Sequence, residues 1–244
     1  YDTVVFAPSI GHWSFLRDIF IYILIVLLKK KHHLIVLCDF DYSRIPKVYK
    51  IILSLNLMET VWSPANLGGA NDLRLFRQLD IQTCDLIKNC TNVYQPVYGN
   101  YLDPMKGVDL FVDWILLHSI QNYEFFGSVL KDTTSYPHFS QQLKFVKADN
   151  KAAFEKLFRE KVSAASAYFY SSRFDLAPLT LEAALLENAA ILVQGSKAEE
   201  IVTRFLGDMP DYTFSIQNGS VICDSQSVYD FNINALKTLA QRPS

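Results

Sequence analysis

The stretch AYFYSSRFDLAPLTLEAALLENAAILV, residues 167–193, contains the pattern that decides the fold. Two short runs of apolar and aromatic residues, AYFY at 167–170 and AILV at 190–193, have the length and composition of buried strands. Between them a polar loop leads to Pro178, which suits the first turn of a helix, and an apolar segment follows as far as residue 188. A strand, a helix and a second strand in this order predict a parallel β-α-β unit.

The same alternation extends toward both ends of the chain. The further strands are expected at residues 3–7, 34–38, 60–62, 92–97, 123–126 and 144–146. The helices are expected at residues 14–31, 46–55, 71–90, 109–120, 151–165, 178–188, 197–205 and 227–240. We therefore predict an α/β protein with parallel sheets. Because the pattern restarts near residue 95, we divide the chain into two α/β domains, residues 1–93 and 94–244.

Composition excludes several classes of protein. Of the 244 residues 50% are hydrophobic, which supplies a core and excludes wholesale disorder. The nine glycines form neither G-x-G-x-x-G nor a Walker-type phosphate loop, which argues against P-loop enzymes and ordinary dinucleotide dehydrogenases. A net charge of -2 gives no support to binding of nucleic acid.

Cysteine spacing and hydropathy bear on location. The four cysteines form no C-x-x-C pair and no zinc spacing with histidine, so we expect reduced thiols in a cytoplasmic protein. The carboxylates and histidines have no tight metal-ligand spacing either, so no residue is assigned as a metal ligand, and use of a divalent ion stays open. The longest apolar run, residues 19–28, is shorter than the roughly 20 residues of a membrane span. The chain starts almost directly in a strand and without methionine, and we expect its N-terminal domain to be incomplete.

Three constellations could carry chemistry. Asp39 and Asp41 follow an apolar strand, where a carboxylate is placed as a general base or metal ligand, or merely caps a turn. Glu182 lies about one turn inside the helix that starts near Pro178, where it could accept two ribose hydroxyls or simply face solvent. His12 lies in the first strand-to-helix turn, as a neutral base, a hydrogen-bond donor or a loop residue without function.

Several segments resemble those of a known family. SSRFDLAPLTLEAALLENAAILVQGSKAEE, residues 171–200, resembles the nucleotide-sugar half of the GT-B glycosyltransferases. The closest resemblance is to the phage DNA β-glucosyltransferases, and it is carried by four further segments. These are YDTVVFAPS at 1–9, KKKHHLIVLCDFDYSRIP at 29–46, VYGNYLDPMKGVDLFVDWILLHSIQNYEFFGS at 97–128, and SYPHF at 135–139 followed by LKFVKAD at 143–149. The resemblance implies a GT-B-like fold of two Rossmann-like domains that face a cleft, with 1–93 on the acceptor side and 94–244 binding the nucleotide sugar. It also implies transfer of a hexose, glucose in the family pattern, from a UDP-sugar.

The resemblance also assigns roles to residues. It implies that Asp39, with Asp41 as its nearest rival, is the catalytic base, and that His12 is the next residue to test. It implies that Glu182 binds the ribose. The positions it implies for contacts to the rest of the nucleotide are Gly99, Gly127, Ser128 and Asp149.

One departure from the family pattern concerns the diphosphate. The family's diphosphate loop carries two arginines, where this chain has Asp103 and Gly107 nearby and Lys106 as the only cation in the loop. We therefore expect Lys106, Arg173, a helix terminus or a divalent ion to meet the charge of the diphosphate.

Three functions remain open at this stage. The first is a glycosyltransferase acting as a monomer, with hydroxymethylated double-stranded DNA as one acceptor and a protein, glycan or small molecule as the alternative. A role in DNA modification would place the protein in a bacteriophage and hence in the host-cell cytoplasm. The second is a nucleotide-sugar-binding module without turnover, and the third is a non-hydrolysing sugar-nucleotide epimerase.

Overall fold

The computed structural model describes residues 3–6, 20–21, 23–24, 31–35, 60–63, 71–72, 86–129, 139, 141–175 and 178–241. By its internal contacts the chain divides into two compact units. The first comprises residues 1–78 together with 243–244, and the second comprises residues 79–242.

The first unit contains a parallel sheet of four short strands among its described residues. They are β1 (Thr3–Phe6), β2 (Lys31–Ile35), β3 (Thr60–Ser63) and β4 (Asn71–Asp72), and they lie side by side in that order. Thr3 is opposite Lys31, and His33 is opposite Thr60. Residues 20–21 and 23–24, inside the predicted helix 14–31, are helical.

Two predictions for this unit are wrong in detail. Strand β2 begins at Lys31 and not at residue 34, so the helix expected to reach residue 31 ends before it. The helix predicted at 71–90 is contradicted at both ends, because β4 begins at Asn71 and residues 86–90 are not helical. The reason at Asn71 is tertiary: it pairs with Trp62 of β3, and this ladder replaces the weak helical preference of Asn and Asp.

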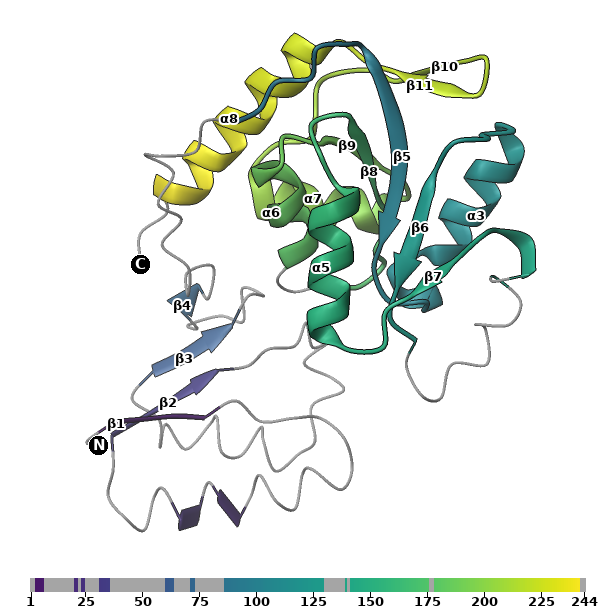
Figure 1. Ribbon diagram of the computed structural model, residues 1–244. Coiled ribbons are helices and arrows are strands. Elements are labelled where there is room, and N and C mark those ends of the chain that lie inside the picture. The colour runs from purple at the N-terminus through teal and green to yellow at the C-terminus, as the bar shows by residue number, and fades with distance from the viewer. Residues whose placement is uncertain are drawn as a thin grey trace. The chain divides into compact units, whose positions relative to one another are not determined.

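The second unit is built on five strands that pair in parallel, and Figure 1 shows how they lie. They are β5 (Val93–Gly99), β6 (Glu124–Gly127), β7 (Val146–Lys147), β8 (Ser166–Tyr170) and β9 (Ala190–Val193). Their order across the sheet is β7-β6-β5-β8-β9. In chain order this is third, second, first, fourth, fifth, the order of a doubly wound Rossmann-like sheet.

An antiparallel hairpin makes this sheet mixed, which corrects the prediction of a wholly parallel one. Strands β10 (Ser215–Gln217) and β11 (Ser220–Ile222) pair with each other, and β11 pairs with the start of β5. The sequence did hold a signal for this hairpin. Asn218 and Gly219 both have positive φ angles, of 50° and 72°, and Asn-Gly is the preferred dipeptide of a two-residue hairpin turn.

The helices of the second unit lie close to their predicted positions. They are α3 (Val108–Leu117), α5 (Lys151–Lys161), α6 (Leu179–Leu186), α7 (Ser196–Leu206) and α8 (Ser225–Gln241). Local chemistry fixes several of their ends. Asn150 caps α5 by accepting a hydrogen bond from the Ala153 amide at 2.9 Å, and Gly207, with φ of 95°, ends α7. Within the described part of the chain, no helix has the length and apolar character needed to cross a membrane.

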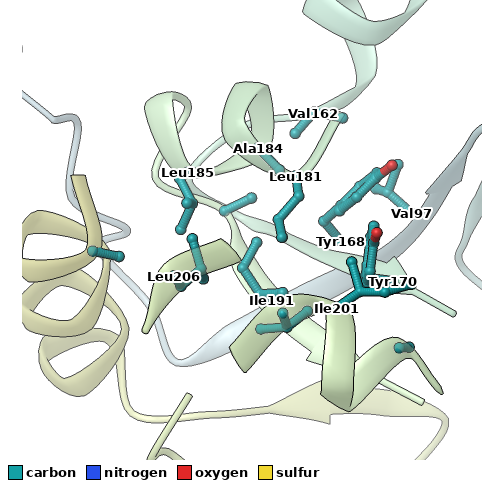
Figure 2. Close-up of a cluster of buried hydrophobic side chains, with 14 of the residues drawn as sticks. Val97, Val162, Tyr168, Tyr170, Leu181, Ala184, Leu185, Ile191, Ile201 and Leu206 are labelled. Atoms are coloured by element: carbon teal, nitrogen blue, oxygen red, sulfur yellow. The ribbon is translucent and has the colours of Figure 1, made fainter. Parts of the chain in front are cut away.

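The central strands are buried on both faces of the sheet. One set of alternating side chains, including Val97, Tyr168 and Ile191, packs against α5, α6, α7 and α8 (Figure 2). The neighbouring residues in the same strands, Tyr98 and Phe169 among them, pack on the other face against α3. Helices on both faces explain why these strands are continuously apolar and not alternating in the sequence.

Phe111 of α3 lies in the core between the sheet and α3, and its replacement tests the assignment of this core. It is fully buried, and its ring centroid lies 5.2–5.3 Å from those of Tyr98, Phe125 and Phe169. We expect Phe111→Ala to lower the free energy of unfolding by about 3–5 kcal/mol, because it removes apolar contacts and leaves a cavity. Leu117→Ala, on the same helix but 78% exposed, is the matched control and should change it by less than about 0.5 kcal/mol. Urea denaturation measures both, and equal losses would contradict this assignment of the core.

Candidate functional site at the carboxyl edge of β5 and β8

The order of the sheet reverses between β5 and β8, which are direct neighbours. β5 pairs with β6 on one side and with β8 on the other, and Val97 is opposite Tyr168. In open α/β sheets, ligands bind beyond the carboxyl ends of the strands at such a reversal. The two loops that leave this edge are residues 100–107, after β5, and the segment after β8, which the structure describes at residues 171–175.

The loop after β5 is held by its own side chains and by a one-turn 3₁₀ helix. The Asp103 carboxylate accepts a hydrogen bond from the Met105 amide at 2.8 Å, which starts the turn Pro104–Lys106. The buried Tyr98 hydroxyl donates to the carbonyls of Tyr101 and Lys106, at 3.0 and 3.2 Å. Burial raises the pKa of Tyr98 well above its ordinary value, so the hydroxyl keeps its proton and acts here as a donor.

Three predicted glycine positions are explained by close contact within the protein. Gly107 has φ of 71°, and a Cβ placed there would overlap the Ser171 backbone. A Cβ at Gly127 would overlap the Asn100 carbonyl, and one at Gly99 would lie 2.6 Å from the Phe126 ring. Gly99 and Gly127, expected to line a nucleotide, thus also let the loop after β5 approach the end of β6.

Hydrogen bonds tie the loop after β8 to the loop after β5. The Arg173 amide donates to the Met105 carbonyl at 2.9 Å, and the Ser171 hydroxyl donates to the Gly107 carbonyl at 2.9 Å. The Tyr168 hydroxyl donates to the Gly99 carbonyl at 3.0 Å, and burial raises its pKa as well. These bonds join segments that are more than 60 residues apart, and they fix the edge where a ligand would bind.

Arg173, one of the two cations predicted for a diphosphate, is paired with Asp109 of α3. Nη1 and Nη2 of Arg173 donate to the two Asp109 carboxylate oxygens at 2.7 and 2.6 Å, and Nη1 also donates to the Pro104 carbonyl. Burial acts to raise the pKa of Asp109, but the hydrogen bonds and the charge of Arg173 prevail and hold it below its ordinary value. Asp109 was not among the residues singled out from the sequence, because its partner is distant along the chain.

Lys106, the other predicted cation, is paired too. Its ammonium group lies 3.0 Å from the Asp175 carboxylate and donates to the Phe174 carbonyl at 3.0 Å. Asp175 is held from a third element, since Arg204 of α7 donates to its backbone carbonyl at 3.1 Å. Both cations thus bridge the two loops.

Glu182 lies in the first turn of α6 with 6% of its surface exposed. The helix begins at Leu179, so Pro178 is its N-cap residue. A solvent-facing glutamate, one of the two interpretations of the sequence, is therefore wrong. A carboxylate is seldom buried in this way, and the positive end of the α6 dipole stabilises its charge.

The remaining predicted contact residues belong to the neighbouring loops. The Ser128 carbonyl accepts a hydrogen bond from the Leu102 amide at 3.0 Å, so it helps to hold the loop after β5. Asp149 is exposed after β7, with its carboxylate 3.7 Å from the Lys147 ammonium group. Asp39, Asp41 and His12 lie outside the described residues.

The residues that the structure describes contain no group of three or more His, Cys, Asp or Glu side chains arranged to hold a metal ion. Cys223 is buried, and burial raises the pKa of its thiol to about 11, so the neutral thiol prevails near pH 7.

Comparison with known proteins gives structural likeness only. No family model matches the chain, and no curated protein matches it. The crystal structure of TarM, a GT-B glycosyltransferase, is similar at 10% identity and a TM-score of 0.49, covering 88% of this chain and 48% of that chain. The chain thus spans about half the length of TarM. The strand order of the second unit itself defines a Rossmann-like α/β domain with a mixed, mostly parallel sheet.

Gly107 offers a test of the contact between the two loops. Gly107→Ala should cost about 1–2 kcal/mol for the left-handed backbone and a further 1–3 kcal/mol for displacing the Ser171 backbone. Gly219→Ala is the matched control, since its φ of 72° is the same but its nearest atom, the Ser119 carbonyl oxygen, is 3.2 Å away. In thermal unfolding, Gly107→Ala should have a clearly lower melting temperature than Gly219→Ala. Equal melting temperatures would refute the tight contact.

Proposed function

We propose that this chain binds a nucleotide diphosphate sugar at the carboxyl edge of β5 and β8 and transfers the sugar, a hexose, to an acceptor hydroxyl. The observation that carries this proposal is the buried carboxylate of Glu182 in the first turn of α6. It lies on the helix that follows β8, next to the position where the strand order reverses. A buried acid there suits a ligand with several hydroxyl groups.

The chemistry of Glu182 and of α6 fits the two polar parts of such a donor. The two carboxylate oxygens can accept hydrogen bonds from the two ribose hydroxyls, and such charge-assisted bonds are stronger than neutral ones. The amide groups at the start of α6 and its positive dipole end favour the phosphates. UDP is the nucleotide that the resemblance to phage DNA β-glucosyltransferases favours, with Asp149 near the uracil and Gly99, Gly127 and Ser128 along the nucleotide.

The proposed catalytic step needs a base on the acceptor side. In our proposal the Asp39 carboxylate takes the proton of the acceptor hydroxyl while that oxygen attacks the anomeric carbon and the nucleotide diphosphate departs. The Asp39 assignment rests on the sequence resemblance, with Asp41 and then His12 as the next candidates. The acceptor is proposed only as a hydroxyl compound. Hydroxymethylated DNA belongs in the test set because of the resemblance, although neither the net charge nor the comparisons support it.

A second candidate function has its own observation. Arg173 and Lys106 are each paired with a carboxylate, Asp109 and Asp175, so part of the charge available to a diphosphate is already neutralised. This arrangement favours a module that binds nucleotide sugars weakly or without turnover. Binding of a UDP-sugar without consumption of the sugar, in the presence of any acceptor tested, would favour this second function.

The donor site is tested with Glu182→Gln, which removes the charge and nearly preserves the size of the side chain. A charged hydrogen bond contributes about 1.5–3 kcal/mol against 0.5–1.5 for a neutral one, so we expect the Kd for UDP to rise at least about tenfold. Glu187→Gln, an exposed residue directly after the same helix, is the control and should bind as the wild type does. Calorimetry with UDP measures the Kd, after a thermal-shift screen of UDP-, GDP- and ADP-glucose. Unchanged affinity in Glu182→Gln would exclude the ribose role.

The catalytic assignment is tested with Asp39→Asn. Loss of a general base should lower turnover by about 10²–10⁴-fold, while UDP-sugar binding stays nearly intact because the base acts on the acceptor. Transfer of labelled sugar to hydroxymethylated DNA, unmodified DNA and small hydroxyl acceptors measures the rate. If Asp39→Asn keeps full activity and Asp41→Asn loses it, Asp41 is the base. If both remain active, His12→Gln is tested next.

A further inference from the structure

One edge of the Arg173 guanidinium group has no hydrogen-bond acceptor among the residues that the structure describes. Of its five N–H donors, both on Nη1 and one on Nη2 are used, by the Asp109 carboxylate and the Pro104 carbonyl. Among the described residues nothing accepts from Nε or from the second Nη2 hydrogen, and the side chain is 36% exposed. In a planar guanidinium these two donors point the same way along one edge, the arrangement that binds two oxygens of a phosphate.

The orientation of this edge depends on Asp109. An unrestrained arginine side chain samples many rotamers, and binding of a ligand would have to remove that freedom. Two bonds to the Asp109 carboxylate and one to the Pro104 carbonyl remove that freedom beforehand. The backbone of Asp109 is itself held, because Asp109 lies in the first turn of α3, a helix that begins at Val108 directly after the left-handed Gly107.

We propose that Asp109 is a positioning residue, which holds Arg173 so that its Nε–Nη2 edge binds a phosphate oxygen pair of an anionic ligand. This inference rests on the proposed function, since it assigns the diphosphate of the proposed donor to that edge. Asp109 touches no ligand in this scheme, because both of its carboxylate oxygens are bonded to Arg173. It acts through the guanidinium.

The direction in which Asp109→Asn changes the affinity for an anion distinguishes a positioning role of Asp109 from a purely electrostatic one. Asp109→Asn removes a negative charge close to the phosphate, so a purely electrostatic role predicts tighter binding of an anion. Loss of positioning predicts weaker binding in spite of that gain in positive charge. A general loss of structure would weaken every ligand, including uridine, which has no phosphate.

The experiment measures the Kd of the full chain for UDP, uridine and inorganic pyrophosphate by calorimetry. Arg173→Ala and Asp109→Asn should each weaken UDP and pyrophosphate by about five- to tenfold, through loss of a charge-assisted pair, and leave uridine within about twofold. Asp113→Asn, the same change of charge at an exposed position one turn along α3, is the matched control and should change none of the three. In an Arg173→Ala background, Asp109→Asn should cause no further loss.

The possible outcomes distinguish failure of the positioning role of Asp109 from failure of the proposed donor site. Unchanged or tighter UDP binding in Asp109→Asn, equal weakening of uridine, or a further loss in the Arg173→Ala background would overturn the positioning role and leave the proposed donor site standing. Pyrophosphate binding that depends on Asp109 and Arg173, without any binding of UDP, would support the role and overturn the proposed donor. A wild-type chain with native circular dichroism that binds neither anion would overturn both.

Discussion

The parallel pairing of β5 with β8 is the constraint on which the rest of the second unit depends. These strands are adjacent in the sheet although more than 60 residues separate them, and both are buried on both faces. Their alternate side chains enter two different cores, one under α3 and one under α5 to α8. Because the pairing is in register from Gln95 to Val97, the loops that follow the two strands must emerge next to each other.

Charge at this edge is organised by contacts within the protein. Lys106 and Arg173 each carry a positive charge toward the edge, and each is bonded to a carboxylate from a different segment. Such pairs give little stability when they are partly exposed, so their effect is chiefly geometric. They fix the directions of the remaining donors. Because the side chains of Lys106 and Arg173 are already held before an anion binds, the entropy cost of binding the anion is lower.

Hydrogen bonds from buried tyrosines also hold the backbone at this edge of the sheet. The Tyr98 hydroxyl donates to backbone carbonyls of the loop after β5, the Tyr168 hydroxyl donates to the carbonyl of Gly99 at the end of β5, and burial raises the pKa of both. Since their neutral forms prevail, these donors remain in place across the physiological pH range. The hydroxyl of the neighbouring Tyr170 makes no hydrogen bond of ordinary geometry with the described residues, and burial and the nearby Asp175 charge raise its pKa as well. The edge thus combines neutral hydroxyl donors with paired charges.

The sequence by itself determined the elements whose signals are local. The strands at 166–170 and 190–193 and the helix between them follow from apolar runs and a proline, and each was predicted within two residues. The hairpin has an equally local signal in its Asn218-Gly219 turn, but the elements predicted from the sequence include neither of its two strands. Glu182 could be placed near the start of a helix for the same reason.

Only the tertiary structure decided what depends on distant partners. Asn71 and Asp72 form a strand because β3 offers a ladder, so the helix expected there fails. The burial of Glu182 depends on how α6 packs against the sheet, which one helical segment cannot reveal. Asp109 and Asp175 became partners of Arg173 and Lys106 because β5 and β8 are neighbours. An ion pair between residues more than 60 positions apart leaves no periodic or spacing signal in a single sequence, since only the fold brings the two charges together.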